Sequence, residues 1–136
     1  MSNSNQNDGE SKPPSTRAQA LENGTLVDAG MKAREAGFKW PVALTLCAWR
    51  CCVAWTVEDS ARQIGQLEAR RLWDVVHVAA QALRLNAGSA DSLLFPVFRV
   101  PKDGVSIDPV EVALKIALGS GDSGEPVVTI MLPNEA

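Results

Sequence analysis

The sequence has no tyrosine and only one histidine, His77, among its 136 residues. Acid–base catalysis needs positioned groups that exchange protons, and a lone histidine without a second such group at recognisable spacing gives that class little support. A basic excess is also missing, since 13 Lys and Arg stand against 16 Asp and Glu. Proteins that bind nucleic acids normally gather Lys and Arg on one face, so this balance argues against a nucleic-acid partner.

Long hydrophobic runs are absent as well. Arg50 divides the apolar stretch 42–55 and His77 interrupts the stretch 75–83, so the sequence predicts no transmembrane helix and no membrane partner. Residues 1–15 lack the cationic start and apolar stretch of a signal peptide. The three cysteines are an odd number within six residues, which is a poor disulfide framework. We therefore expect a cytoplasmic protein.

What the sequence does contain is enough for one hydrophobic core. Apolar residues make up 46% and charged residues 21%, close to globular averages. Residues 1–15 are almost free of apolar side chains, and ordering them would cost conformational entropy without burying surface. We predict a disordered tail over residues 1–15 and a single α+β domain over 16–136.

The first part of that domain shows helical signals. Thr16 or Ser15 can cap a short helix that ends at Gly24, and a β segment is expected over residues 25–28. Another helical turn over residues 31–36 would end at Gly37. Pro41 and apolar residues at three- and four-residue spacing predict a further helix over 42–53. Its remaining faces carry little charge, so it is either enclosed within the domain or covered by another chain.

The longest helical pattern begins at Thr56, which forms a capping-box-like pair with Asp59. The pattern continues to about residue 86, with a break expected at Gly65, and shows a broad apolar face. This helix should cover one face of the sheet that follows.

After residue 88 the pattern changes to that of strands. Apolar residues alternate over 110–118, and the neighbouring strands are expected over 93–100 and 127–132. Pro96 has no amide hydrogen, which indicates an edge strand or a bulge. The predicted fold class is α+β, with a helical N-terminal half whose long helix packs on a C-terminal antiparallel meander of three or four strands.

Polar side chains of both signs share one side of the predicted long helix at three- and four-residue spacing. As a binding site, this stripe would use His77 as a titratable group oriented by Asp74, with two arginines for a carboxylate or phosphate. As an ordinary solvated face, it would hold only weak local ion pairs. The stripe consists of Arg70, Asp74, His77, Gln81 and Arg84.

Three other motifs give weaker signals. Cys47, Cys51 and Cys52 lack the paired spacing of zinc ligands and the Cys-x-x-Cys pattern of redox proteins, so inert thiols are expected. The segment 121–124, Gly-Asp-Ser-Gly, resembles the tetrapeptide around a chymotrypsin-like nucleophile, but its residue types are those that a hairpin loop selects. We therefore assign no catalytic residue, no metal and no cofactor.

Trp49 and Arg50 lie next to each other on the predicted 42–53 helix, and Trp49 is off its main apolar face. Tryptophan and arginine are enriched at the energetic centres of protein interfaces. These two residues are therefore a candidate interface, with burial within the same chain as the alternative.

Several segments together resemble a family of small bacterial proteins of unknown function, found in genomes, plasmids and phages. The resemblance spans about residue 16 to the C-terminus and implies a cytoplasmic protein, without implying an activity or cofactor. The segments are Leu26-Val-Asp28, Ala33-Arg-Glu-Ala-Gly-Phe38, Pro41-Val-Ala-Leu-Thr45, Arg71-Leu-Trp-Asp74, Gly124-Glu-Pro126 and Thr129-Ile-Met-Leu-Pro133.

The leading functional hypothesis from the sequence is a non-enzymatic binding or regulatory protein, as an accessory of a mobile element, with a protein partner or a homo-oligomer. The alternative is a small enzyme or ligand-binding protein that uses the stripe around His77.

Overall fold

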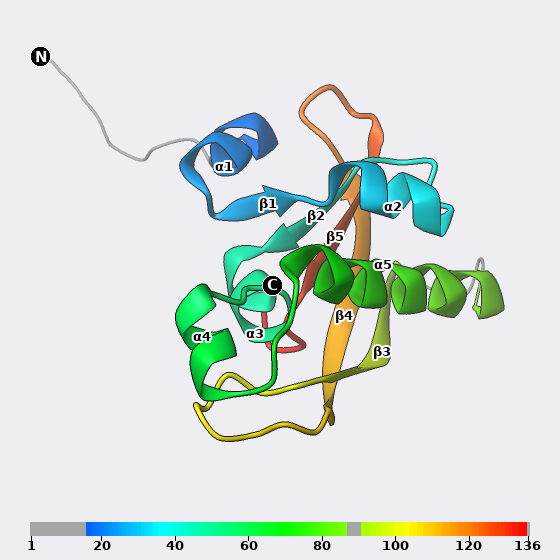
Figure 1. Cartoon of the computed structure of the whole chain (residues 1–136). Helices are drawn as coiled ribbons and strands as arrows, with labels where there is room; N and C mark the ends of the chain where they lie inside the picture. The colour runs from blue at the N-terminus through cyan, green and yellow to red at the C-terminus, as the bar shows by residue number, and fades with distance from the viewer. Residues whose placement is uncertain (1–15, 87–90, 136) are drawn as a thin grey trace, which may run out of the picture.

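The computed structural model describes residues 16–86 and 91–135, and Figure 1 shows their arrangement. One mixed sheet contains five strands in the order β1-β2-β5-β4-β3. The tail predicted over residues 1–15 lies outside the described residues. The strands are β1 (Leu26–Asp28), β2 (Val42–Thr45), β3 (Ser92–Arg99), β4 (Val110–Ser120) and β5 (Pro126–Met131).

The helices begin and end where local capping dictates. Thr16 and Thr56 accept from backbone amides three residues on, each within a capping box, and Gly24 and Gly37 end their helices with positive φ. These predicted caps and stops are confirmed. The helices are α1 (Arg17–Asn23), α2 (Gly30–Ala36), α3 (Leu46–Cys52), α4 (Val57–Arg62) and α5 (Glu68–Leu85).

The helix predicted over residues 42–53 is wrong in its first turn. Val42, Ala43 and Leu44 are all buried within β2, between β1 and β5. A strand buried on both faces reads as a continuous apolar run, which periodicity alone does not separate from a helix. Thr45 marks the true start of α3, because its side chain accepts from the Ala48 amide at 3.2 Å.

The break expected at Gly65 is confirmed, since α4 and α5 are separate helices on either side of it. The antiparallel meander β3-β4-β5 is also confirmed, and β3, which contains Pro96, is an edge strand as predicted. The strand number was too low, because β2 pairs in parallel with β5 and β1 adds to β2. The N-terminal half therefore contributes two strands as well as helices.

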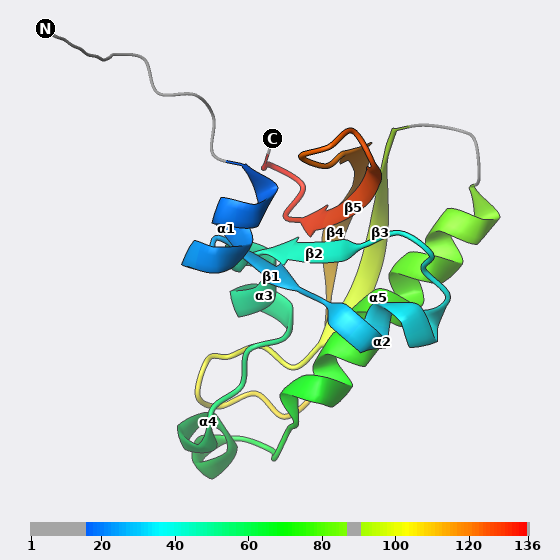
Figure 2. The same cartoon turned by 90° about the horizontal axis from the view of Figure 1, so that it is seen from above.

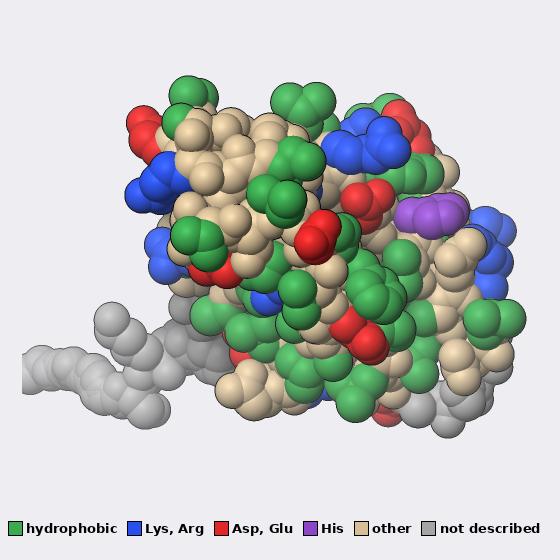
Figure 3. Space-filling model, turned by 60° about the horizontal axis from the view of Figure 1, so that its bottom comes forward, with side chains coloured by type: hydrophobic (Ala, Val, Ile, Leu, Met, Phe, Trp, Pro, Cys, Tyr) green, Lys and Arg blue, Asp and Glu red, His purple; other side chains and the backbone are tan. Residues whose placement is uncertain are grey.

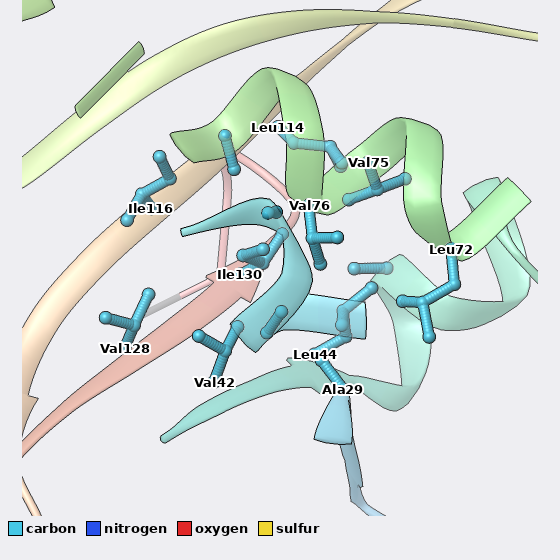
Figure 4. Close-up of a cluster of buried hydrophobic side chains, with 14 of the residues drawn as sticks. Ala29, Val42, Leu44, Leu72, Val75, Val76, Leu114, Ile116, Val128 and Ile130 are labelled. Atoms are coloured by element: carbon cyan, nitrogen blue, oxygen red, sulfur yellow. The ribbon is translucent and has the colours of Figure 1, made fainter. Parts of the chain in front are cut away.

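The core lies between one face of the sheet and helices α2, α3 and α5. Figure 2 shows α2 and α5 on the same side of the sheet, and Figure 4 shows side chains of α5 meeting those of the strands. Val75 and Val76 on α5, with Leu44, Leu114 and Ile130 on the strands, are fully buried in this cluster. Packing of the long helix on the meander is thus confirmed.

The Gly-Asp-Ser-Gly segment is the predicted loop between β4 and β5. Its Asp122 carboxylate accepts from the amides of Arg17 and Ala18 at 2.8 and 3.0 Å, at the start of α1. Arg17 in turn donates to the Thr129 hydroxyl and the Val128 carbonyl of β5. The loop therefore fastens α1 to the sheet and has a structural role.

Candidate functional site

The polar stripe predicted on α5 lies at the surface but does not converge on one site. Arg70 and Asp74 form an exposed pair with 3.9 Å between Nε and Oδ1. The His77 ring stacks on Trp73 with centroids 5.2 Å apart, and among the described residues no hydrogen bond joins it to Asp74. Gln81 is exposed further along the helix. Figure 3 shows the histidine at the surface near Lys and Arg side chains.

The last stripe residue, Arg84, belongs to a different hollow. It lines a largely apolar depression of about 410 Å³ together with Phe38, Lys39 and Trp40. Arg70 and Asp74 line another depression, of about 480 Å³, near the start of α5. The structure thus places Arg70 and Asp74 at one depression and Arg84 at another.

The candidate interface residues are placed on α3. Trp49 is half-buried and packs against the hydrophobic core, whereas Arg50 is exposed. On the same helix Cys47 is exposed, Cys51 is half-buried and Cys52 is buried. Within residues 16–86 and 91–135 no group of three His, Cys, Asp or Glu side chains is placed to hold a metal ion.

The most unusual side chain of the described chain is Arg71, which is only 4% exposed on the core side of α5. Its Nε donates to the Val53 carbonyl at 3.0 Å, and its Nη1 donates to the Gln66 side chain at 2.9 Å and the Val100 carbonyl at 3.2 Å. Its Nη2 is the one buried side-chain nitrogen or oxygen of the described residues without a hydrogen-bond partner. A buried charged donor that lacks an acceptor is costly, and contact with the Trp55 ring, whose centroid lies 4.6 Å from the guanidinium carbon, offsets part of this cost.

A cavity of about 110 Å³ lies beside this arginine. Arg71 and Asp74 line it from α5, Cys52 from α3, and Arg99 from the end of β3. Gln66, Arg71 and Asp74 also line the larger 480 Å³ depression, so the two hollows are neighbours. Two guanidinium groups therefore border one small, partly enclosed space.

Arg99 connects the cavity to Cys51. Its Nε donates to the Cys51 carbonyl at 3.0 Å, and its Nη2 lies 3.7 Å from the Cys51 sulfur. A side-chain hydrogen bond with Cys52, followed by the hydrogen bond and charge of Arg99, lowers the pKa of Cys51 to about 5 against the opposing effect of burial. The same hydrogen bond, together with burial, raises the pKa of the Cys52 thiol.

The two arginines also act on each other. Burial lowers the pKa of Arg71, and the charge of Arg99 lowers it further, while the cysteines and Asp59 oppose this. Two like charges near one cavity favour any anion that enters it.

The sequence reasoning missed this group. A signal was present, because Arg71 precedes Val75 by four residues and so lies on the apolar face of the amphipathic helix. A charged residue on the core face of a helix indicates a buried, partnered group. The contribution of Arg99 depends on the contact of β3 with α3, which no local pattern reveals.

Fold and site together define an α+β protein in which a five-stranded mixed sheet is covered by helices and a small cavity holds two arginines. The chain belongs to a family of unknown function (DUF6573), whose sequence pattern matches residues 14–136. No curated protein and no solved structure matches it. Across the described residues no helix is long and apolar enough to span a membrane.

Proposed function

We propose that the protein is a non-enzymatic binding protein whose ligand carries a small anionic group, a carboxylate or a phosphate, held in the cavity beside Arg71. The observation that carries the proposal is the buried Nη2 of Arg71, which has a charge and a hydrogen to donate but no acceptor. Nη2 is enclosed by protein atoms, so the guanidinium must turn toward the cavity before an anionic oxygen can accept that hydrogen bond and offset the cost of burying the charge.

The size of the cavity suits this ligand class. A water molecule occupies about 30 Å³ of the liquid, so a cavity of about 110 Å³ holds a few waters or one small oxoanion. The rest of a larger ligand would lie in the neighbouring 480 Å³ depression, which Arg70 and Leu67 line. Arginine is well suited to such recognition because its planar fork donates two parallel hydrogen bonds.

The charges around the cavity set the expected strength of binding. Arg71 and Arg99 attract an anion, whereas Asp74 on the same wall repels it. Asp74 is about half exposed, so solvent screens its effect more than that of the buried arginine. Removing this carboxylate should therefore strengthen binding without disturbing the core.

The test is isothermal titration calorimetry with inorganic phosphate and with acetate, at constant ionic strength. We expect one saturable site for at least one of these anions. Arg71→Gln should weaken binding by roughly tenfold or more, because it removes a charge-assisted hydrogen bond. Asp74→Asn should tighten binding by roughly two- to fivefold.

Arg84→Met is the matched control, because it removes an exposed arginine from the same helix at the other depression. Its affinity should equal that of the wild type. The proposal is wrong if wild-type protein shows no saturable binding, or if Arg84→Met and Arg71→Gln weaken binding equally. Circular dichroism of each variant shows whether the fold is retained, and Asp74→Asn keeps the test valid if Arg71→Gln does not fold.

A second candidate function, contact with a protein partner, has its own observation. The segments 57–67 and 98–110 touch each other through Gln63, which donates to the carbonyls of Pro101 and Ser106 at 2.8 and 2.6 Å. In Figure 3 the end of the molecule that carries α4 and the loop between β3 and β4 is turned toward the viewer. Hydrophobic side chains cover much of the visible face. The exposed large apolar residues of these segments are Val57, Ile64, Leu67, Phe98, Val105, Ile107 and Val110.

We propose that a second copy of the chain binds to this apolar surface. Arg62 and Lys102 lie 3.6 and 3.5 Å from the Asp59 carboxylate within these segments, so the charges beside the apolar residues are largely balanced, which suits a surface that meets its own copy. Sedimentation velocity should then show a concentration-dependent dimer. The double substitution Val105→Ser with Ile107→Ser should abolish it, whereas the control Leu85→Ser, at the end of α5, should still dimerise. A monomer at every concentration would exclude it. The mobile-element role stays a prediction from the family resemblance.

A further inference from the structure

Cys51 differs from the other two cysteines in combining access with a cation. Cys47 is exposed, and Cys52 is 1% exposed and closed off in the core. The Cys51 sulfur is half-buried and has the Nη2 of Arg99 at 3.7 Å. Thiolates rather than thiols react with electrophiles, and neighbouring cations favour the thiolate, so the three sulfurs should differ in reactivity.

The groups that act on this sulfur come from three elements. Cys52 on the same helix offers a side-chain hydrogen bond, Arg99 from β3 offers a hydrogen bond and a charge, and Arg71 from α5 adds a more distant charge. Burial opposes ionisation, as does the position in the last turn of α3, where the helix dipole is negative. The balance of these effects places the pKa of Cys51 below the ordinary thiol value.

The arginine that holds Cys51 also lines the anion cavity. We propose that Cys51 is a modification site at which its thiolate reacts with small hydroperoxides, and that an anion bound beside Arg71 and Arg99 slows this reaction. The inference rests on the proposed anion-binding function and adds a chemical consequence to it. Thiolate and bound anion are alternative partners for the same positive charge, so each disfavours the other.

The chemical step balances with the peroxide as oxidant. The Cys51 thiolate attacks one peroxide oxygen, a sulfur–oxygen bond forms, and the oxygen–oxygen bond breaks. Hydrogen peroxide loses hydroxide and an organic hydroperoxide loses alkoxide; the departing group takes a proton from solvent and becomes water or an alcohol. The sulfur is oxidised by two electrons to a sulfenic acid, and the peroxide is reduced by the same two electrons.

The first experiment measures the alkylation rate of each cysteine with iodoacetamide against pH, followed by peptide mass spectrometry on the reduced full chain. At about pH 6 Cys51 should react roughly tenfold faster than Cys47, because the Arg99 guanidinium beside its sulfur favours the reactive thiolate. Cys47 is the internal control, since it is exposed on the same helix. Hydrogen peroxide with dimedone, which traps sulfenic acids, should label Cys51 first.

The second experiment repeats both reactions with inorganic phosphate at constant ionic strength. Phosphate should slow Cys51 by roughly threefold or more at about pH 6 and leave Cys47 unchanged. Arg99→Gln should slow Cys51 in the absence of phosphate, whereas Arg84→Met should not. Thermal unfolding of Arg99→Gln shows whether the variant folds. If it does not fold, the effect of phosphate on the wild-type chain still tests the coupling.

Either of two results would overturn the inference even where the anion-binding function holds. One is a pH profile of Cys51 that coincides with that of Cys47. The other is that calorimetry shows phosphate binding but phosphate leaves the reaction rate of Cys51 unchanged. This result would exclude the coupling between anion binding and Cys51 reactivity, and the anion-binding function would remain. If phosphate and acetate do not bind at all, the proposed function fails and the coupling fails with it.

Discussion

The guanidinium carbon of Arg71 lies 4.6 Å from the centroid of the Trp55 ring. This contact and the hydrogen bonds to the Val53 and Val100 carbonyls tie α5 to the chain between α3 and α4 and to the residue after β3, and a third hydrogen bond holds Gln66, just before α5. Arg71→Met should lower the free energy of unfolding by about 2–4 kcal/mol, because it leaves buried carbonyls without donors. Urea unfolding measures the change. Arg70→Met, on the exposed side, should change it by less than about 0.5 kcal/mol, and equal losses would contradict this role.

The fold could be predicted wherever a local signal decides it. Thr16, Gly24 and Gly37 fix helix ends through their own backbone and side-chain preferences, and alternation places β4. The strand β2 could not be recognised, because its burial comes from pairing with β5 at the other end of the chain. The number of strands in a sheet depends on such long-range pairing, which a single sequence does not display.

The core should respond strongly to truncation at its centre. Leu114 is fully buried on β4, so Leu114→Ala should destabilise the protein by about 2–5 kcal/mol through lost burial and the cavity that remains. Leu85, which is 85% exposed, provides the control, and Leu85→Ala should change stability by less than about 0.5 kcal/mol. The denaturant midpoints of the two variants, each compared with that of the wild type, measure these changes. A small loss for Leu114→Ala would mean that the core tolerates a cavity there.

The end of α2 depends on a glycine. Gly37 has φ of 111°, and an added Cβ would lie 3.3 Å from the Arg84 side chain. Gly37→Ala should therefore lower the free energy of unfolding by about 1–2 kcal/mol. Gly65 has open space around it and no positive φ, so Gly65→Ala should leave stability unchanged or raise it by up to about 1 kcal/mol. Thermal unfolding compares them, and a loss at Gly65 that matches that at Gly37 would contradict the conformational argument.

Acid should loosen the loop between β3 and β4. Hydrogen bonds from the Ser106 side chain, and then from the Ser106 and Val105 amides, lower the pKa of Asp103 to about 2. The unfolded pKa is about 3.9, so this group stabilises the folded state above about pH 4, and the contribution is lost as pH falls toward 2. Asp103→Asn should thus show a smaller fall in Tm than the wild type between about pH 5 and pH 2. Parallel curves for the two proteins would show that Asp103 makes no such contribution.

Much less of the candidate site than of the fold could be predicted. The stripe from Arg70 to Arg84 follows from helical spacing and is present, but Arg70 and Asp74 line one depression, Arg84 lines another, and Asp74 also lines the small cavity. The cavity instead uses Arg71, one residue away, because a rotation of about 100° per residue moves a side chain from the surface to the core face. Which side of an amphipathic helix binds a ligand is decided by what packs against it.

The position of β5 between β2 and β4 has a consequence for synthesis on the ribosome. The strands β1 and β2 are made early, yet they can join β4 and β3 only through the strand made last. Until residues 126–131 emerge, the nascent chain holds two sheet fragments, each with an unpaired edge that can associate with other chains. Completion of the sheet is therefore expected only once residues 126–131 are available to pair, at a rate limited by closure of the long loop between β2 and β5.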